Sequence, residues 1–291
     1  MLTPWHDRRG RLVLIKAVAL ALCCVPIPLI LYPLLGDGFA GRPLNGLVHE
    51  SGKWAVRLTV AAVALTPITV AMRWSRLALT RRIVGVSAAA YALAHFAFYV
   101  AEQGFAVRVV ISEILNRSYL TIGFVALVGL MAMAVTSLDA AMRQMGRWWK
   151  RLHRLIYPVT ALALLHFFMQ TKANVFEPTL IAGLATWILL WRLVPAGYYN
   201  TLWIYFALAI VAFFATISIE YAWYALATSV NPDRLLAANW SLRYAPRPAH
   251  WVGTIALLGA MIVTARAMWT RNIPLPRRAA GVAATIKPPP R

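Results

Sequence analysis

Residues 83–103 read IVGVSAAAYALAHFAFYVAEQ, an apolar run that follows Arg81 and Arg82 and contains a single histidine, His95. At about 1.5 Å per residue, a helix of this length spans about 31 Å, which matches the hydrocarbon core of a bilayer. The run therefore predicts a membrane-spanning helix. Similar runs recur along the chain, and they predict eight spans, near 12–35, 54–72, 83–103, 119–138, 150–170, 178–196, 201–225 and 249–269.

The composition agrees with a membrane protein. Hydrophobic residues make up 61% of the 291 residues and charged residues 13%, with a mean hydropathy of +0.65. Soluble domains carry about 25% charged residues, so a water-soluble fold is excluded. The net charge of +20 is better explained by basic residues placed between apolar runs than by binding of nucleic acid. The predicted fold class is an all-α, polytopic membrane helical bundle with about eight transmembrane helices, in contact with membrane lipid.

The basic residues also predict an orientation. Most of them flank the even-numbered loops and the two ends of the chain, so the positive-inside rule places both termini in the cytoplasm. Four segments are expected: a cytoplasmic N-terminus (1–11), a six-helix membrane domain (12–197), two additional spans with a long outer loop (198–270), and a basic, proline-rich tail (271–291). We expect the tail to be disordered, because it carries little that can pack.

Motifs for other chemistry are weak. The segment 36–41 matches G-x-G-x-x-G, but it follows a membrane helix rather than a strand, so we interpret the match as accidental. Cys23 and Cys24 are adjacent and fit neither a disulfide framework nor a zinc site. The sequence shows no internal repeat of fixed period. Charged residues near span ends, such as Glu220, are interpreted as snorkelling or interfacial.

Two histidines lie deep in predicted spans and at matching depth. His95 is 13 residues after Arg82, and His166 is 15 residues after Arg151, which places the imidazoles roughly 20 and 22 Å from the cytoplasmic side. Two neutral imidazoles at one level could ligate a haem iron from opposite faces. The alternative is that each histidine only hydrogen-bonds a carbonyl on a neighbouring helix.

A third histidine, His153, lies at the predicted cytoplasmic edge of the fifth span. It is 13 residues before His166, about 140° away on an ideal helix, although Pro158 between them could kink the helix. Three roles stay open for His153: ligand of a second, inner haem, contact to a flavin or quinone, or interfacial histidine. His49 is expected in a solvated outer loop, and the alternative is that it guides a partner or a haem propionate.

An ordered set of motifs resembles the MsrQ family, also called YedZ, within the ferric-reductase-like transmembrane superfamily. The motifs are His49-x-x-Gly52, Leu65-Thr66-Pro67, Arg81-Arg82-x-x-Gly85 before His95, Tyr119-Leu120-Thr121-x-Gly123, Thr136-Ser137, and Trp149-x-x-Leu152-His153-x-x-Tyr157 before His166. The resemblance covers residues 10–196 and six of the eight predicted spans. The two spans after Gly197 depart from the family pattern.

The resemblance implies a function and its site residues. It implies haem b held by His95 and His166, His153 as a third intramembrane histidine, and FMN and quinone as further ligands. Electrons from quinol or a cytosolic flavin reductase would cross the bacterial inner membrane to a periplasmic, molybdopterin-dependent methionine-sulfoxide reductase (MsrP-like) that repairs oxidised proteins. The alternative is a reductase that delivers electrons to ferric iron or another small external acceptor. A transporter is disfavoured, because no central carboxylate marks an ion site.

Overall fold

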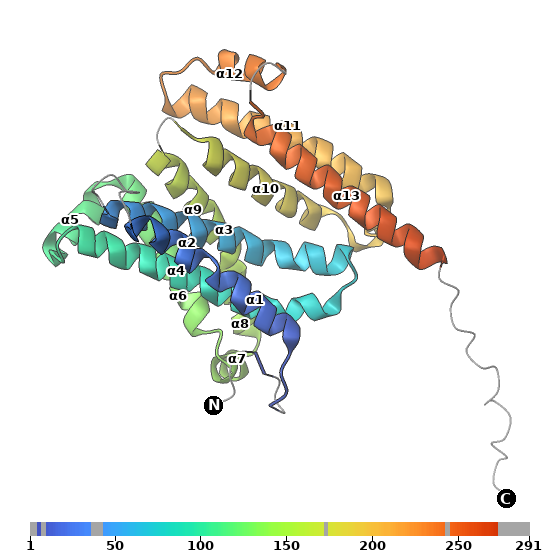
Figure 1. The fold of residues 1–291 in the computed structure, drawn as a ribbon, viewed down its shortest axis with the longest axis horizontal. Helices are drawn as coiled ribbons and strands as arrows, with labels where there is room; N and C mark the ends of the chain where they lie inside the picture. The colour runs from blue at the N-terminus through green and yellow to red at the C-terminus, as the bar shows by residue number, and fades with distance from the viewer. Residues whose placement is uncertain (1–4, 7–9, 36–42, 172–173, 242–244, 273–291) are drawn as a thin grey trace, which may run out of the picture.

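The computed structural model describes residues 5–6, 10–35, 43–171, 174–241 and 245–272 (Figure 1). Every regular element in these ranges is a helix, which confirms the predicted all-α class. The segment 36–41, most of the N-terminus 1–11 and all but two residues of the tail 271–291 lie outside the described residues. The α-helices are α1 (Leu14–Cys24), α2 (Pro26–Leu31), α3 (Pro43–Ala71), α4 (Arg81–Glu102), α5 (Val107–Asn116), α6 (Ser118–Val135), α7 (Asp139–Met145), α8 (Arg147–Leu152), α9 (Ile156–Thr171), α10 (Phe176–Leu193), α11 (Leu202–Ala227), α12 (Pro232–Asn239) and α13 (Pro248–Asn272).

Seven stretches of the described chain are long and apolar enough to cross a membrane. They are Leu14–Leu34, Pro43–Ala71, Ser75–Glu102, Ser118–Val135, Arg147–Thr171, Leu202–Ala227 and Pro248–Trp269. The span predicted at 178–196 corresponds to α10, an 18-residue helix whose hydropathy is lowered by Glu177 and Arg192. The chain is therefore a multi-pass membrane protein, and each predicted span is helical.

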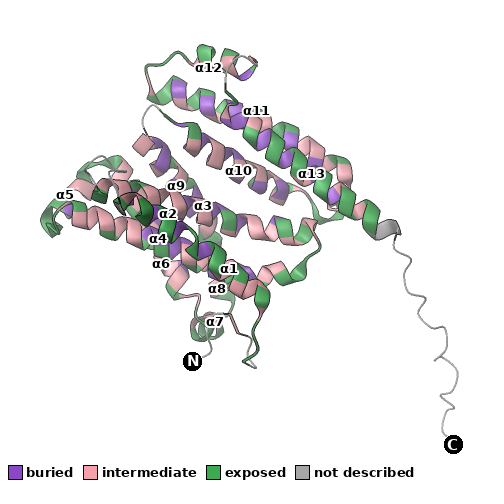
Figure 2. Cartoon of the chain, in the orientation of Figure 1, coloured by how far each residue is buried: buried purple, intermediate pink, exposed green. Residues whose placement is uncertain are grey.

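The main core lies where α3, α4, α6 and α9 meet (Figure 2). Buried apolar residues from these four helices, such as Ala55, Ala92, Leu130 and Ala163, form one continuous cluster. Because a bilayer adds no hydrophobic drive between helices, small residues at these contacts allow the close packing that holds the bundle. The arrangement places α4 and α9, which carry the two deep histidines, on opposite sides of a common space.

The hairpin of α11 and α13 packs on α10, away from this core (Figure 1). A glycine makes the contact close: a Cβ atom at Gly183 would overlap the Thr216 hydroxyl oxygen and would lie 2.8 Å from Val252 Cγ2. No side chain fits at that distance. The two helices beyond the six-span pattern are thus joined to the rest of the bundle by tight backbone packing on α10.

A buried ion pair fixes the loop between α11 and α13. Glu220 is only 2% exposed, which overturns its interpretation as a snorkelling residue. Its Oε1 accepts a 2.5 Å hydrogen bond from Arg247, and its Oε2 accepts from the Asn239 amide at 3.2 Å. Sequence reasoning missed this pairing because Arg247 lies 27 residues later, beyond an unpredicted short helix, α12.

We expect Arg247→Ala to destabilise the hairpin strongly, since the variant leaves the Glu220 carboxylate buried without its cation. Breaking a buried pair typically costs about 3–5 kcal/mol, whereas replacing both partners by apolar groups costs much less. Thermal unfolding in detergent should therefore show a lower Tm for Arg247→Ala than for the double variant Glu220→Leu/Arg247→Met. Equal Tm values for the two variants would contradict this account of the pair.

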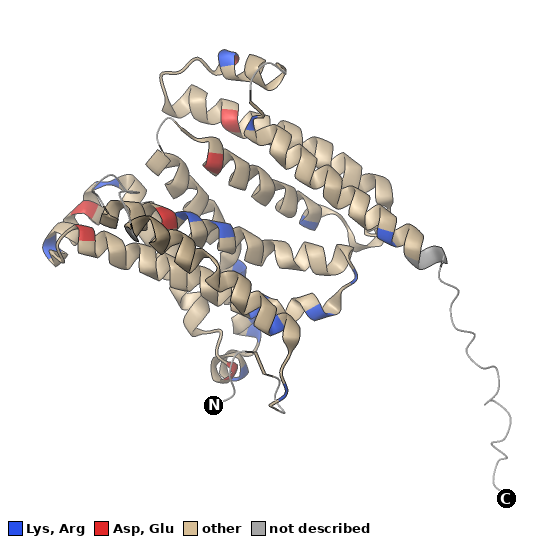
Figure 3. Cartoon of the chain, in the orientation of Figure 1, with Lys and Arg blue, Asp and Glu red and all other residues tan. Residues whose placement is uncertain are grey.

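Acidic residues are unevenly divided between the two ends of the bundle (Figure 3). At one end, Arg73 donates to Asn200 at 2.7 Å and Arg82 pairs with Asp139 at 2.6 Å, which links three loops. The other end carries basic residues such as Lys53, Arg57, Arg117 and Arg247 together with the remaining described acids: Glu50, Glu102, Glu113, Glu177, Glu220 and Asp233. The first end therefore has an excess of Lys and Arg, which is the feature that the positive-inside rule uses.

Candidate functional site

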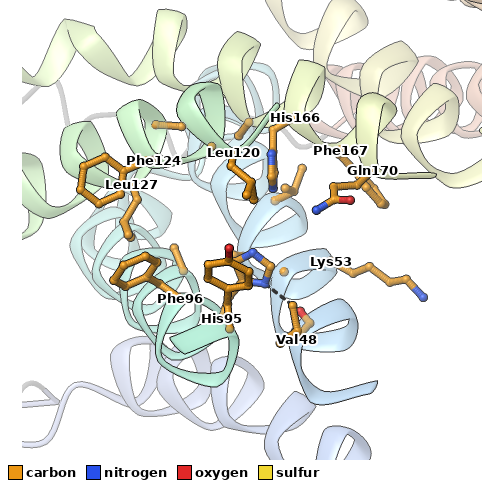
Figure 4. A pocket seen from close by; sticks show the side chains of 18 of the residues that line it. Val48, Lys53, His95, Phe96, Leu120, Phe124, Leu127, His166, Phe167 and Gln170 are labelled. Atoms are coloured by element: carbon orange, nitrogen blue, oxygen red, sulfur yellow. Dashed lines mark hydrogen bonds between the residues drawn. The ribbon is translucent and has the colours of Figure 1, made fainter. Parts of the chain in front are cut away.

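A pocket opens between α3, α4, α6 and α9 (Figure 4). It contains about 1120 Å³ of space between atoms, a volume that includes open space at its mouth. Its walls are mostly small or apolar, and include Ala92, Ala126, Leu127 and Ala163. The pocket can therefore take a mainly apolar ligand.

His95 and His166 extend into this pocket from opposite sides, from α4 and α9 (Figure 4). Their ring centres are 6.2 Å apart and their planes are inclined by 76°. With metal–nitrogen bonds of about 2.0–2.1 Å and roughly 1.1 Å from ring centre to nitrogen, two imidazoles on opposite sides of one metal have centres about 6.3 Å apart. The observed separation thus fits two axial ligands of one metal.

Each imidazole is oriented by a backbone carbonyl on a neighbouring helix. His95 Nδ1 lies 2.7 Å from the Val48 carbonyl oxygen, and His166 Nδ1 lies 2.7 Å from that of Tyr119. A carbonyl accepts only, so each Nδ1 carries the proton and each Nε2 keeps a free lone pair. The sequence left open that each histidine only hydrogen-bonds a carbonyl on a neighbouring helix, and both of these hydrogen bonds are present. They do not exclude metal binding, because a metal-binding histidine typically donates its other ring N–H to such a carbonyl.

Two glycines let the imidazoles lie directly against helix backbones. A Cβ atom at Gly52 would lie 2.8 Å from His95 Nδ1, and a Cβ atom at Gly123 would lie 2.7 Å from His166 Nδ1. Contacts this short are not tolerated, so any other residue at either position would displace the ring. Gly85 on α4, by contrast, has no atom near its would-be Cβ.

The pocket is built from two copies of the same helical hairpin, α3–α4 and α6–α9, which corrects the expectation of no internal repeat. In the first hairpin the pocket histidine, the carbonyl that it contacts and the glycine beside it each have a counterpart 71 residues later in the chain. The matching pairs are Val48 and Tyr119, Gly52 and Gly123, Ala55 and Ala126, Ala92 and Ala163, His95 and His166, Phe96 and Phe167, and Tyr99 and Gln170. The site thus has an approximate two-fold symmetry.

His153 lies outside this pocket. Its ring stacks on Trp149 with centres 3.9 Å apart, its Nδ1 bonds the Trp149 carbonyl at 3.0 Å, and its Nε2 is 3.4 Å from the Ser137 hydroxyl. The chain between His153 and Leu155 is a 3-10 turn, so the helix geometry changes before Pro158 rather than at it. The position 71 residues earlier is Arg82, not a histidine. The structure brings no second imidazole to His153.

Other residues complete the pocket. His49, expected in a solvated loop, lies on α3, which starts at Pro43, and it lines the pocket beside Lys53. The described residues contain no group of three or more His, Cys, Asp or Glu side chains that could hold a metal ion by themselves. Two imidazoles alone suit a metal whose remaining ligands come with it, as in a porphyrin.

The fold and the pocket define a class: a polytopic helical membrane protein with a pair of opposed histidines in its core. The chain matches the family described as "Ferric reductase like transmembrane component" over residues 51–164. No solved structure gives a significant match.

Curated relatives define the family more closely. The "Protein-methionine-sulfoxide reductase heme-binding subunit MsrQ" of Xanthomonas axonopodis pv. citri is 39% identical over 158 residues, 54% of this chain and 72% of the relative. The protein of the same name from Rhodospirillum rubrum is 33% identical over 195 residues, 66% of this chain and 90% of the relative. The chain belongs to the MsrQ family, whose role in membrane electron transfer agrees with the pocket.

Proposed function

We propose that this chain is a haem b electron-transfer subunit that carries electrons across the bacterial inner membrane to a periplasmic methionine-sulfoxide reductase of the MsrP type. The observation that carries the proposal is the 6.2 Å separation of two imidazoles whose free Nε2 atoms face a large apolar pocket. The name of the relatives, heme-binding subunit, supports the cofactor. When bound, haem supplies one-electron transfer between ferric and ferrous iron.

The residues of the chain have distinct tasks in this function. His95 and His166 would supply the two axial nitrogens, while the Val48 and Tyr119 carbonyls hold their protons on Nδ1. The apolar walls exclude water and so favour a low-dielectric site, which is one of the means by which a protein sets a haem potential. No proton or substrate atom needs to move in the pocket, so it requires no general acid or base.

The proposed direction of transfer runs from the end of the bundle that has an excess of basic residues to the opposite end. Under the positive-inside rule the end with Arg73 and Arg82 would be cytoplasmic, and both termini would then be cytoplasmic too. Quinol or a cytosolic flavin reductase would donate electrons at that side, where FMN is a further candidate ligand near His153. The pocket lies nearer the opposite, periplasmic end, next to the partner.

The test is an optical spectrum of the detergent-purified chain with pyridine-haemochrome quantification. We expect a six-coordinate b-type spectrum and about one haem per chain, and a chain that binds no haem would contradict the proposal. Turnover then separates the acceptors: an electron-transfer subunit reduces methionine sulfoxide only with its periplasmic partner, whereas a ferric reductase reduces a ferric chelate unaided.

His153→Ala should retain haem, in contrast to changes at the two pocket histidines. The ring of His153 contacts Trp149 and Ser137 and does not line the pocket, so its removal leaves both axial nitrogens in place. Haem content and the six-coordinate spectrum measured on the purified variant should stay close to those of the unmodified chain. Loss of half or more of the haem would instead support His153 as a ligand of a second haem.

A further inference from the structure

Apart from the two imidazoles and Thr59, whose hydroxyl donates to the Ala55 carbonyl, the polar side chains that line the pocket lie at one end of it. Lys53 lies in the first half of α3, Tyr99 near the last residue of α4, and Gln170 next to the last residue of α9, so all three lie at the same end of the bundle. The opposite end is closed by apolar residues, among them Leu127 and Leu130. The pocket therefore offers a polar rim and an apolar floor to whatever it binds.

The rim holds a polar atom that the protein leaves without a partner. The Tyr99 hydroxyl is buried, and it forms no hydrogen bond with any described residue. Buried polar groups are nearly always hydrogen-bonded, so an orphaned hydroxyl in a ligand pocket indicates a partner on the ligand. The amide of Gln170 also turns toward the pocket (Figure 4).

Lys53 supplies the charge of the rim. Among the described residues that line the pocket it is the only lysine or arginine. Its ammonium group lies 2.6 Å from a Glu50 carboxylate oxygen and 3.9 Å from one of Glu177, and Arg57 pairs with Glu177 on the next turn of α3. Lys53 extends away from the pocket centre (Figure 4), and 30% of its side chain is exposed. If Lys53 turned toward an anion in the pocket, Glu177 would keep Arg57 as its partner, and Glu50 would exchange its ion pair for water.

Resting on the proposed function, we propose that Tyr99, Gln170 and Lys53 bind the propionate carboxylates of the haem. A carboxylate at the apolar floor would lose its hydration without a donor, which is costly, whereas the rim offers a hydroxyl, an amide and an ammonium group. The haem would therefore be held with its carboxylate edge at the periplasmic end and its apolar edge at the bilayer centre.

The two-fold symmetry provides one polar donor for each of the two propionates. Tyr99 follows His95 by four residues, and Gln170 follows His166 by four, so each donor lies one helical turn beyond one axial ligand. Two equivalent donors match two propionates. Lys53 breaks the symmetry, because its counterpart in the second hairpin is Phe124. One propionate should therefore interact with a cation and the other with neutral donors.

The test uses Tyr99→Phe, Gln170→Leu and Lys53→Met in the full chain loaded with haem. Optical redox titration measures the ratio of reduced to oxidised haem, and resonance Raman spectroscopy monitors the propionate vibrations. Losing the cation leaves the propionate charge uncompensated and so favours ferric iron, and we expect the ratio at a fixed potential to fall about tenfold for Lys53→Met. The other two variants should shift it in the same direction by less, and each should alter the propionate bands.

Tyr91→Phe is the matched control, because Tyr91 is on the same helix but donates to the Cys23 carbonyl outside the pocket. Its haem should keep the potential and Raman bands of the unmodified chain. Unchanged potential and bands in all three rim variants would overturn the assignment, as would equal shifts in Tyr91→Phe. Loss of haem from the three rim variants, with haem retained in Tyr91→Phe, would support the assignment. If the unmodified chain bound no haem, the proposed function would fail instead.

Discussion

Replacing His166 with alanine is expected to remove haem from the purified protein, and His95→Ala should have the same effect. In the proposed site each imidazole would provide one of two axial nitrogens, and the described wall of the pocket offers no other group in an equivalent place. Losing even an outer-shell partner of a metal ligand typically costs 10–100-fold in affinity, so loss of the ligand itself should cost more. The measurement is pyridine-haemochrome content together with the low-spin optical spectrum.

His250→Ala is the control for these two variants. This histidine lies on α13, accepts a hydrogen bond from the Arg247 backbone and contacts Phe213, all outside the pocket. Its haem content should equal that of the unmodified chain. If His95→Ala or His166→Ala retained a six-coordinate spectrum at full haem content, the two rings could not be the axial ligands.

Gly123→Ala is expected to weaken haem binding because it displaces the imidazole of His166, although His166 itself is unchanged. The added methyl group would lie 2.7 Å from His166 Nδ1, so the ring must turn away from both the Tyr119 carbonyl and the pocket centre. Overpacking of this kind costs about 1–3 kcal/mol, or roughly 5- to 150-fold in affinity. Gly52→Ala should act on His95 in the same way, and the low-spin electron paramagnetic resonance signal, which reports the ligand planes, should change in both variants.

Gly85→Ala separates this effect from a general effect on helices. Alanine is the better helix former by about 1 kcal/mol, so none of these substitutions should weaken its helix. At Gly85 the new methyl group meets open space, and the spectrum should stay unchanged. If all three variants behaved alike, the glycines would not position the histidines.

The sequence predicts the parts of this molecule that depend on composition and depth. Long apolar runs place the helices, because hydropathy reports directly on transfer into a bilayer. Equal depth on parallel spans pairs His95 with His166, because helix rise converts residue counts into distance. Their separation and carbonyl partners agree with that pairing.

Features that depend on contacts between distant segments could not be predicted in the same way. The roles of Gly52 and Gly123 appear only when each glycine is seen against a ring from another helix. The repeat of 71 residues was hidden because few paired residues are identical, although the shared pattern Ala-Leu-x-His-Phe, at 92–96 and 163–167, was a signal that could have shown it. Likewise, burial of Glu220 depends on a loop whose path hydropathy does not report.

The position of α10 suggests how this chain differs from its shorter relatives. The Rhodospirillum rubrum protein is covered over 90% of its length by a 195-residue alignment, which leaves little room for a further pair of spans. In the present chain α11 and α13 attach to α10 and contribute no side chain to the pocket. Because neither helix lines the pocket, changes on their outward faces should leave the space around the two histidines as it is.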